Sequence, residues 1–249
     1  MILHLLLALL MQTAVVETAN PLEGLYAEAM TAMEVGEWTE AISKLEEILI
    51  EDPSHLNSRF NLAVSFGEAG QIEPALNIYR ALVIEDPKFF EARMNLAILL
   101  NESGRSEEAI VEFADAVDLR PEDPLPALYR AQLLDQTSRV EETIQAYRAV
   151  LDIDPDLVEA HARLGFIYRD MDNTDGAIRE LVLAIELGSV APSVFVAAGD
   201  IEFDRERLDT ARGYYERADQ LAPNDAEIRR RLVLVLRNQE QLSEAISIL

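Results

Sequence analysis

Proline recurs along this chain at a fixed spacing, the number of residues that separates Pro53 from Pro87. Proline ends helices and sharpens the turns that follow them, so its regular return predicts one structural unit repeated along the chain. The chain has only 10 glycines and 10 prolines, which favours long helices over a turn-rich β fold. The positions on the interval are Pro53, Pro87, Pro121 and Pro155, then Ser189, then Pro223.

Other positions keep the same period, and their residue types are those of a helical hairpin. Small residues recur at two further places in each repeat, Ala29 and Ala41 in the first, where they let two helix axes approach closely. Large apolar residues occur eight residues before each interval position, where they fill the space between helices. A glycine at the inner turn is present in the first three repeats, as Gly36, Gly70 and Gly104. The large residues are Leu45, Tyr79, Phe113, Tyr147, Leu181 and Tyr215.

This pattern resembles the tetratricopeptide repeat family. The first repeat has Leu25, Ala29, Trp38, Ala41 and Leu45 at places that the family favours. The resemblance implies an all-α, right-handed superhelical solenoid of antiparallel helix pairs, in which the first helix of each pair lines a concave inner wall. The six full repeats are 22–55, 56–89, 90–123, 124–157, 158–191 and 192–225, and a partial seventh spans 226–249.

Two repeats depart from the pattern. The fifth has Gly188 and Ser189 where other repeats have a turn such as Asp-Pro. The sixth has Glu202, Arg212 and Asp219 at places that are mostly apolar elsewhere. These departures are consistent with drift in a tolerant repeat or with a specialised contact surface.

Charge and composition exclude several classes of function. The net charge of −25 argues against nucleic acid as a partner, because phosphate binding needs clustered Lys and Arg. The chain has no cysteine and three histidines, and it carries no phosphate-binding loop, nucleophile elbow or metal-binding helix motif. We therefore expect a noncatalytic protein without cofactor, metal or small-molecule substrate.

Residues 1–19 form a separate N-terminal segment. An apolar run, interrupted by His4, extends from Ile2 to Met11 and is too short to span a bilayer, which takes about 20 residues. Its length predicts a signal peptide, and hence a periplasmic or secreted protein. An uncleaved membrane anchor, or a helix packed on the first repeat in a cytoplasmic protein, is the alternative.

The resemblance also implies a peptide-binding groove along the first helices. Asn61 and Asn95 occupy equivalent places in consecutive repeats, and a carboxamide pairs with both N–H and C=O of an extended peptide. The alternative is that they are ordinary polar surface residues. The predicted groove residues are Tyr26, Met30, Phe60, Asn61, Val64, Met94, Asn95, Ile98, Tyr129, Gln132, Arg163 and Phe166.

Further along the chain, five arginines fall on the implied inner wall. They would bind an acidic segment, or they would balance nearby carboxylates such as Asp170, Asp200 and Asp204. These arginines are Arg163, Arg169, Arg230, Arg231 and Arg237.

The expected function is a scaffold that binds a protein or peptide segment in its concave groove and acts in assembly of a complex. One alternative is a structural subunit that self-associates or docks through its last helix, because Leu242, Ile246 and Leu249 lie there without a polar cap. A second is an envelope assembly factor similar to the pilotins of pilus secretins, although the lipid-anchoring cysteine of those proteins is absent.

Overall fold

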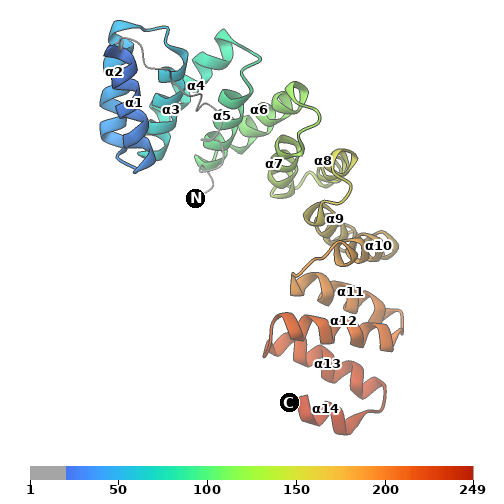
Figure 1. The fold of residues 1–249 in the computed structure, drawn as a ribbon. Coiled ribbons are helices and arrows are strands. Elements are labelled where there is room, and N and C mark those ends of the chain that lie inside the picture. The colour runs from blue at the N-terminus through green and yellow to red at the C-terminus, as the bar shows by residue number, and fades with distance from the viewer. Residues whose placement is uncertain (1–20, 249) are drawn as a thin grey trace. The chain divides into compact units, whose positions relative to one another are not determined.

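The computed structural model describes residues 21–248, so the N-terminal segment predicted at 1–19 and Leu249 lie outside the described residues. The described part of the chain consists of helices joined by short turns, with no strand (Figure 1). The all-α fold class predicted from the sequence is therefore confirmed. The helices are α1 (Pro21–Glu34), α2 (Trp38–Glu51), α3 (Leu56–Glu68), α4 (Ile72–Glu85), α5 (Phe90–Glu102), α6 (Ser106–Leu119), α7 (Pro124–Asp135), α8 (Val140–Ile153), α9 (Val158–Asp170), α10 (Thr174–Glu186), α11 (Pro192–Asp204), α12 (Leu208–Leu221), α13 (Ala226–Asn238) and α14 (Leu242–Ile248).

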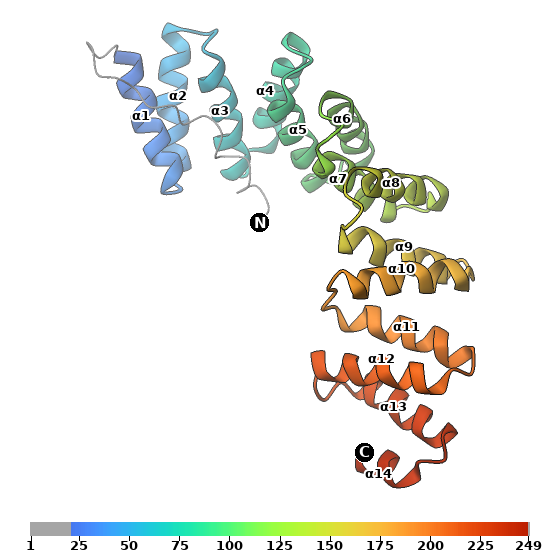
Figure 2. The same cartoon turned by 45° about the vertical axis from the view of Figure 1, so that its right-hand side comes forward.

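Each predicted repeat contains two of these helices. The first helix packs on the second in α1–α2, α3–α4, α5–α6, α9–α10, α11–α12 and α13–α14. The second helix of a repeat then packs on the first helix of the next, as α10 does on α11 and α12 does on α13. Figure 2 shows α9 to α13 side by side, as expected of a solenoid of helix pairs.

The chain divides into two compact units after Leu133, within α7. Unit 1 comprises α1 to α6 and most of α7, and unit 2 comprises the end of α7 and α8 to α14. Each unit is described by itself below.

The residues that follow the repeat period form the core. The small residues Ala41, Ala75, Ala109, Ala177 and Ala211 are fully buried, so neighbouring helices approach closely. The large residues eight places before the interval positions are also buried, with at most 2% exposed. This arrangement confirms the predicted division between small residues at helix crossings and large residues between the helices. The large residues are Leu45, Tyr79, Phe113, Tyr147, Leu181 and Tyr215.

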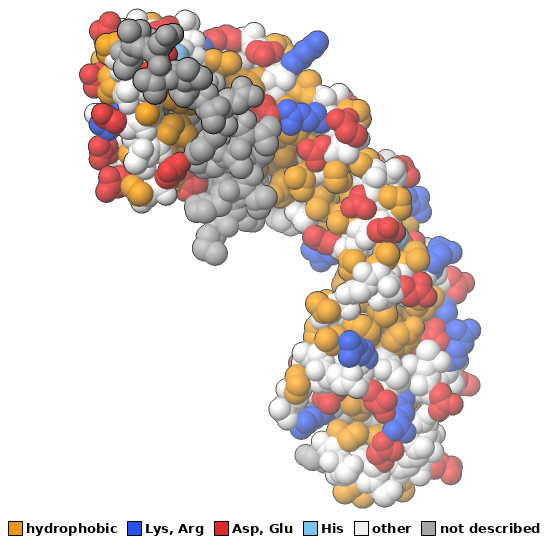
Figure 3. Space-filling view, in the orientation of Figure 1, with side chains coloured by type: hydrophobic (Ala, Val, Ile, Leu, Met, Phe, Trp, Pro, Cys, Tyr) orange, Lys and Arg blue, Asp and Glu red, His pale blue; other side chains and the backbone are white. Residues whose placement is uncertain are grey.

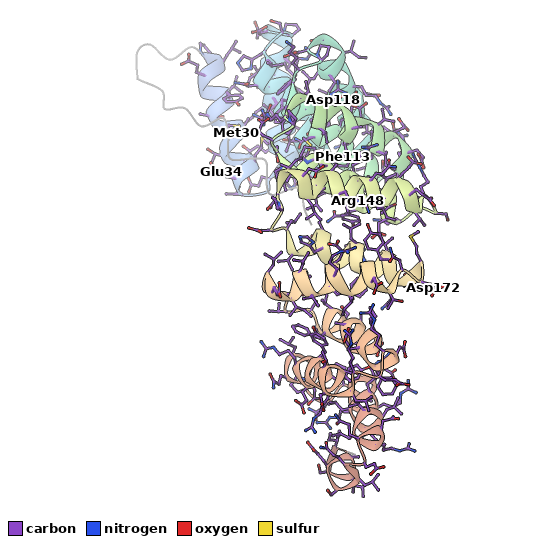
Figure 4. All side chains as sticks on the ribbon, turned by 90° about the vertical axis from the view of Figure 1, so that its right-hand side faces the viewer. Met30, Glu34, Phe113, Asp118, Arg148 and Asp172 are labelled. Carbon is purple, nitrogen blue, oxygen red and sulfur yellow. The ribbon has the colours of Figure 1, made fainter. Side chains whose placement is uncertain are left out.

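Most of the inner turns share one backbone conformation but not one residue type. Gly36, Gly70 and Gly104 have φ between 75° and 80°, which glycine adopts without steric cost. The equivalent places of the fifth, sixth and seventh repeats hold residues with side chains and nevertheless keep a left-handed φ, of 57° at Asp172, 60° at Glu206 and 62° at Glu240, whereas Ser138 in the fourth repeat does not. Asp172 lies at the turn between α9 and α10 (Figure 4). The packing of the two flanking helices therefore imposes the turn even where glycine is missing.

Among residues 21–248, the structure contains no helix that is long and apolar enough to cross a membrane.

Candidate peptide-binding surface

The predicted groove residues all lie on first helices of repeats. Unit 1 carries those on α1, α3, α5 and the part of α7 before residue 134, and unit 2 carries two residues of α9. Arg163 is exposed, and Tyr26, Met30, Tyr129, Gln132 and Phe166 are partly exposed. The buried members are Phe60, Asn61, Val64, Met94, Asn95 and Ile98.

The side chain of Asn61 is held by two predicted groove residues of the preceding repeat. Its Nδ2 atom donates a hydrogen bond to the Tyr26 hydroxyl at 2.7 Å and approaches Met30 Sδ at 3.2 Å. Tyr26 and Met30 both lie on α1, and Asn61 lies on α3. The structure therefore brings these three residues together. Figure 4 labels Met30 on α1.

Asn95 occupies the equivalent place on α5 but takes its partner from another helix. Its Nδ2 atom donates to the hydroxyl of Tyr79 at 3.3 Å, and Tyr79 belongs to α4. The place equivalent to Tyr26 holds Phe60, which has no hydroxyl and packs edge-on against Tyr79 at 5.9 Å between ring centroids. Consecutive repeats thus fix their asparagines by one shared device, a phenol from a neighbouring helix.

Both phenols are suited to hold an amide. Burial raises the pKa of Tyr26 and of Tyr79, so each hydroxyl stays protonated at neutral pH. Within residues 21–248, no hydrogen bond uses the side-chain oxygen of Asn61 or of Asn95. Each asparagine is therefore fixed in orientation through its NH₂ group while its carbonyl oxygen is left as an acceptor.

Sequence reasoning missed Tyr79 as a partner of this surface. It assigned the position to the core, and Tyr79 is indeed 1% exposed. The missed signal was that a tyrosine replaces the leucine of the first repeat at this place, which brings a polar hydroxyl into the core.

Aromatic rings extend the surface along unit 1. Phe60 also packs against Phe89, with ring centroids 5.4 Å apart, and Tyr129 stacks on Phe113 at 5.4 Å. Tyr129 takes the place of the asparagines in the next repeat. The series therefore passes from amide side chains to an aromatic side chain along the unit.

In unit 2, the predicted groove residues lie among charged partners. Arg163 forms an ion pair with Asp135, with Nη2 3.0 Å from Oδ2, and the Arg169 guanidinium lies 5.3 Å from the Phe166 ring centroid. A guanidinium near an aromatic face is a cation–π contact.

Most of the inner-wall arginines are paired with carboxylates. Arg169 pairs with Asp170 at 2.9 Å, Arg231 with Asp200 at 2.7 Å, and Arg230 with Glu227 at 2.7 Å. Acidic and basic side chains are interspersed on the face of unit 2 seen in Figure 3. In the structure, these arginines and Arg163 are thus paired with nearby carboxylates, which is one of the two arrangements expected from the sequence. Asp204, the third carboxylate expected to balance them, forms no ion pair within the described part of the chain.

The polar residues of the sixth repeat are accommodated by ion pairs. Glu202 is 3% exposed, and its carboxylate lies 3.1 Å from Arg207 Nη1 and 3.5 Å from Arg205 Nη1. Arg212 donates to Glu216 Oε1 at 2.6 Å and reaches Glu244 on α14. The repeat therefore keeps its helical packing with polar residues at places that are apolar elsewhere.

Alkaline pH is expected to weaken unit 2 through Tyr147. Burial, together with the nearby Asp135 charge, raises the pKa of Tyr147 to about 12, whereas an exposed tyrosine ionises near pH 10. The unfolded chain releases this proton first, so the stabilisation is complete below about pH 10 and is lost as pH rises toward about 12. Guanidinium unfolding across this window should show a smaller loss for Tyr147→Phe than for the wild-type chain. Parallel losses would contradict the assignment.

Of the three residues predicted for an end interface, two are exposed and one lies outside the described residues. Leu242 and Ile246, on α14, are 60% and 70% exposed, while Leu249 lies outside the described residues.

Within residues 21–248, no group of three or more His, Asp or Glu side chains is placed to hold a metal ion.

The comparisons with known proteins address the fold. A family model described as tetratricopeptide repeat matches residues 26–73, 60–124, 163–226 and 196–249, which together are well over half of the chain. No curated protein sequence matches the chain.

Several solved structures are similar. The structure titled for Pseudomonas aeruginosa pilF has a TM-score of 0.62 at 18% identity, covering 84% of this chain and 95% of that one. YrrB, described as a TPR protein with an unusual peptide-binding site, has a TM-score of 0.60 at 15% identity, covering 79% and 97%. MamA has a TM-score of 0.59 at 19% identity, covering 64% and 93%. At these identities the likeness concerns the fold alone.

Apart from α7 and α8, each helix lies wholly or partly in a segment that the family model matches. The chain belongs to the tetratricopeptide repeat family.

Proposed function

We propose that this chain is a noncatalytic scaffold that acts in the assembly of a protein complex and binds an extended peptide segment of a partner along the first helices of unit 1. The observation that carries the proposal is the pair Asn61 and Asn95, each held through its NH₂ group by a phenol with its carbonyl oxygen left as an acceptor. An extended peptide presents backbone N–H groups at regular intervals, and a fixed carbonyl acceptor recognises them whatever the side chains are.

Preorganisation supports this role. The hydrogen bonds to Tyr26 and Tyr79 fix the asparagine side chains before a peptide arrives, so binding orders fewer groups. The partly exposed Tyr26 and Met30 add apolar contact area next to the Asn61 acceptor, and the partly exposed Tyr129 occupies the equivalent place of the fourth repeat. The predicted export of the chain depends on residues outside 21–248 and stays a prediction.

The double variant Asn61→Ala/Asn95→Ala is expected to weaken capture of the partner at least tenfold. A buried peptide N–H left without its acceptor costs about 1–3 kcal/mol, and about 1.4 kcal/mol corresponds to a factor of ten in affinity. The measurement is a crosslinked pulldown from native extract, with the captured proteins quantified by mass spectrometry.

A matched control is available in the same unit. Asn57 on α3 and Asn77 on α4 are exposed and lie outside the groove series, so Asn57→Ala/Asn77→Ala should capture the partner as well as the wild-type chain does. Circular dichroism of both double variants establishes that they are folded. A partner captured equally by both would overturn the assignment of the groove.

A further inference from the structure

A polar side chain clamps the start of the first helix in the third and fifth repeats. In the third, Arg93 Nη1 lies 2.6 Å from Glu112 Oε2 and 2.6 Å from Asp115 Oδ2, and its Nη2 donates to the Pro87 carbonyl at 3.4 Å. Arg93 is 8% exposed. The clamp therefore joins α5, α6 and the turn before α5.

The fifth repeat builds the same clamp with histidine. His161 lies two repeat periods after Arg93, and its Nδ1 is 2.8 Å from Glu180 Oε2. Its Nε2 is 2.9 Å from the Pro155 carbonyl. Glu180 and Pro155 are the period equivalents of Glu112 and Pro87. The third and fifth repeats, which differ in sequence, thus hold the start of the first helix by the same kind of contact, from one side chain to a carboxylate and to the carbonyl of the preceding proline.

The sixth repeat has no such clamp, and neither has the fourth, where Ala127, Ala146 and Ala149 stand at the equivalent places. In the sixth repeat, the equivalents of the clamping cation and of its two carboxylate partners are Phe195, Tyr214 and Arg217, and the equivalent of the proline is Ser189. A cavity of about 600 Å³ lies among these residues, between the end of α10, the turn before α11, and α12. The place that Arg93 and His161 close in the third and fifth repeats is open here. We call it the α10–α12 cavity.

Apolar groups form the walls of the α10–α12 cavity. Ile185, Val190, Phe195 and Tyr214 line it, and Val190 is 72% exposed. Gly213 also lines it, and a Cβ atom added there would meet no atom within 4 Å, so the absence of a side chain widens the opening. A volume near 600 Å³ is in the range of sites that hold small ligands or a few side chains.

The basic group of the cavity is left without a charged partner. The Arg217 guanidinium donates to Gln220 Oε1 at 2.9 Å, and no carboxylate within residues 21–248 lies at ion-pair distance from it. This is unusual in a chain of net charge −25, where most arginines are paired. Asp209, at the other end of the cavity, accepts a hydrogen bond from Gln239. An apolar opening therefore lies beside a cation that has no carboxylate partner.

We propose that the α10–α12 cavity binds a peptide segment of a partner protein that inserts a large apolar side chain beside Phe195 and Tyr214 and places a carboxylate on Arg217. A carboxylate matches the planar guanidinium in geometry and charge. The cavity shares no residue with the groove of unit 1, so this second site does not depend on the function proposed above.

The test uses small peptide probes of defined chemistry on the full chain. N-acetyl-Phe-Asp-amide carries both recognised groups, N-acetyl-Phe-Asn-amide lacks the charge, and N-acetyl-Ala-Asp-amide lacks the ring. Binding is followed by amide chemical shifts of Gly188, Gly213 and Tyr214 in two-dimensional NMR spectra. We expect the Phe-Asp probe to shift these amides and the Phe-Asn probe to bind roughly two- to fivefold more weakly, as an exposed ion pair predicts.

Two variants make the test specific. Gly213→Leu places a side chain into the cavity at a helical site with free space, so the fold is retained and binding of the Phe-Asp probe should be lost. Arg217→Gln should make the Phe-Asp and Phe-Asn probes bind equally. Asn61→Ala/Asn95→Ala should bind the Phe-Asp probe as the wild-type chain does, whether or not the groove binds a peptide.

Three outcomes would overturn the proposal. One is that the Phe-Asp probe leaves the three amides unshifted. Another is that Gly213→Leu binds the probe as well as the wild-type chain. The third is that sedimentation shows a wild-type dimer and a Gly213→Leu monomer, since a second copy of the chain would then occupy the cavity.

Discussion

Replacing Phe113 by alanine is expected to lower the free energy of unfolding of unit 1 by about 3–5 kcal/mol. Phe113 is 1% exposed, lies on α6 among packed helices of unit 1 (Figure 4), and stacks on Tyr129. Removing the ring leaves a cavity that rigid neighbouring helices fill only in part. Because a repeat contacts only its neighbours, the loss should be concentrated near α6.

Hydrogen exchange gives the location of this effect. Amides of α5 and α6 should lose protection in Phe113→Ala, while those of α11 to α13 in unit 2 keep theirs. Phe113→Leu is the control, because it retains most of the apolar volume and should lose less than half as much stability. Equal protection of α5 and α6 in the alanine variant and the wild-type chain would show that the ring does not hold this part of unit 1 together.

Replacing Gly199 by alanine is expected to destabilise unit 2 by about 1–3 kcal/mol. A methyl group at Gly199 would lie 2.6 Å from Cε1 of Tyr215, which is 2% exposed. The ring has little freedom to move, since the Tyr215 hydroxyl donates to Asp200 at 2.7 Å and Asp200 also accepts from Arg231 at 2.7 Å. The added methyl group therefore forces α11 and α12 apart or breaks this network.

The same substitution at Gly213 should have the opposite sign. Gly213 is also helical and also lies in unit 2, but a Cβ atom there meets no atom within 4 Å. Gly213→Ala should raise the stability of unit 2 by about 0.5–1 kcal/mol, because alanine loses less backbone entropy in a helix. Calorimetric unfolding of both variants measures the difference. Equal unfolding temperatures would mean that close packing at Gly199 does not determine whether an added methyl group stabilises or destabilises unit 2.

The α10–α12 cavity shows how a repeat reveals a departure that one sequence position alone does not. Phe195 alone is an unremarkable apolar residue at the start of a helix. Its meaning comes from Arg93 and His161, which occupy the same place in the third and fifth repeats and contact a carboxylate and a backbone carbonyl there. Gly188 and Ser189, noticed in the sequence as a departure from the Asp-Pro turn, line the same cavity. The two departures therefore lie next to each other in space, and both belong to the lining of the α10–α12 cavity.

Much of the fold was predictable because its determinants are local and repeated. The fixed interval between prolines placed the helix pairs, and the small and large residues at constant offsets identified the buried positions. The groove residues were predictable only as positions on first helices. Their partners were not, since Asn61 and Asn95 are equivalent in sequence but bond to phenols from different helices, Tyr26 on α1 and Tyr79 on α4.

The sequence by itself therefore determined the family, the repeated helix pairs and the core positions. Each follows from periodicity that a residue and its near neighbours express. Only the tertiary structure decided which arginines are paired, why Asp172 and Glu206 adopt a left-handed turn without glycine, and where a cavity lies open. The physical reason is that contacts between helices depend on distances across the repeats, and a side chain from one repeat completes or leaves open the surface of the next.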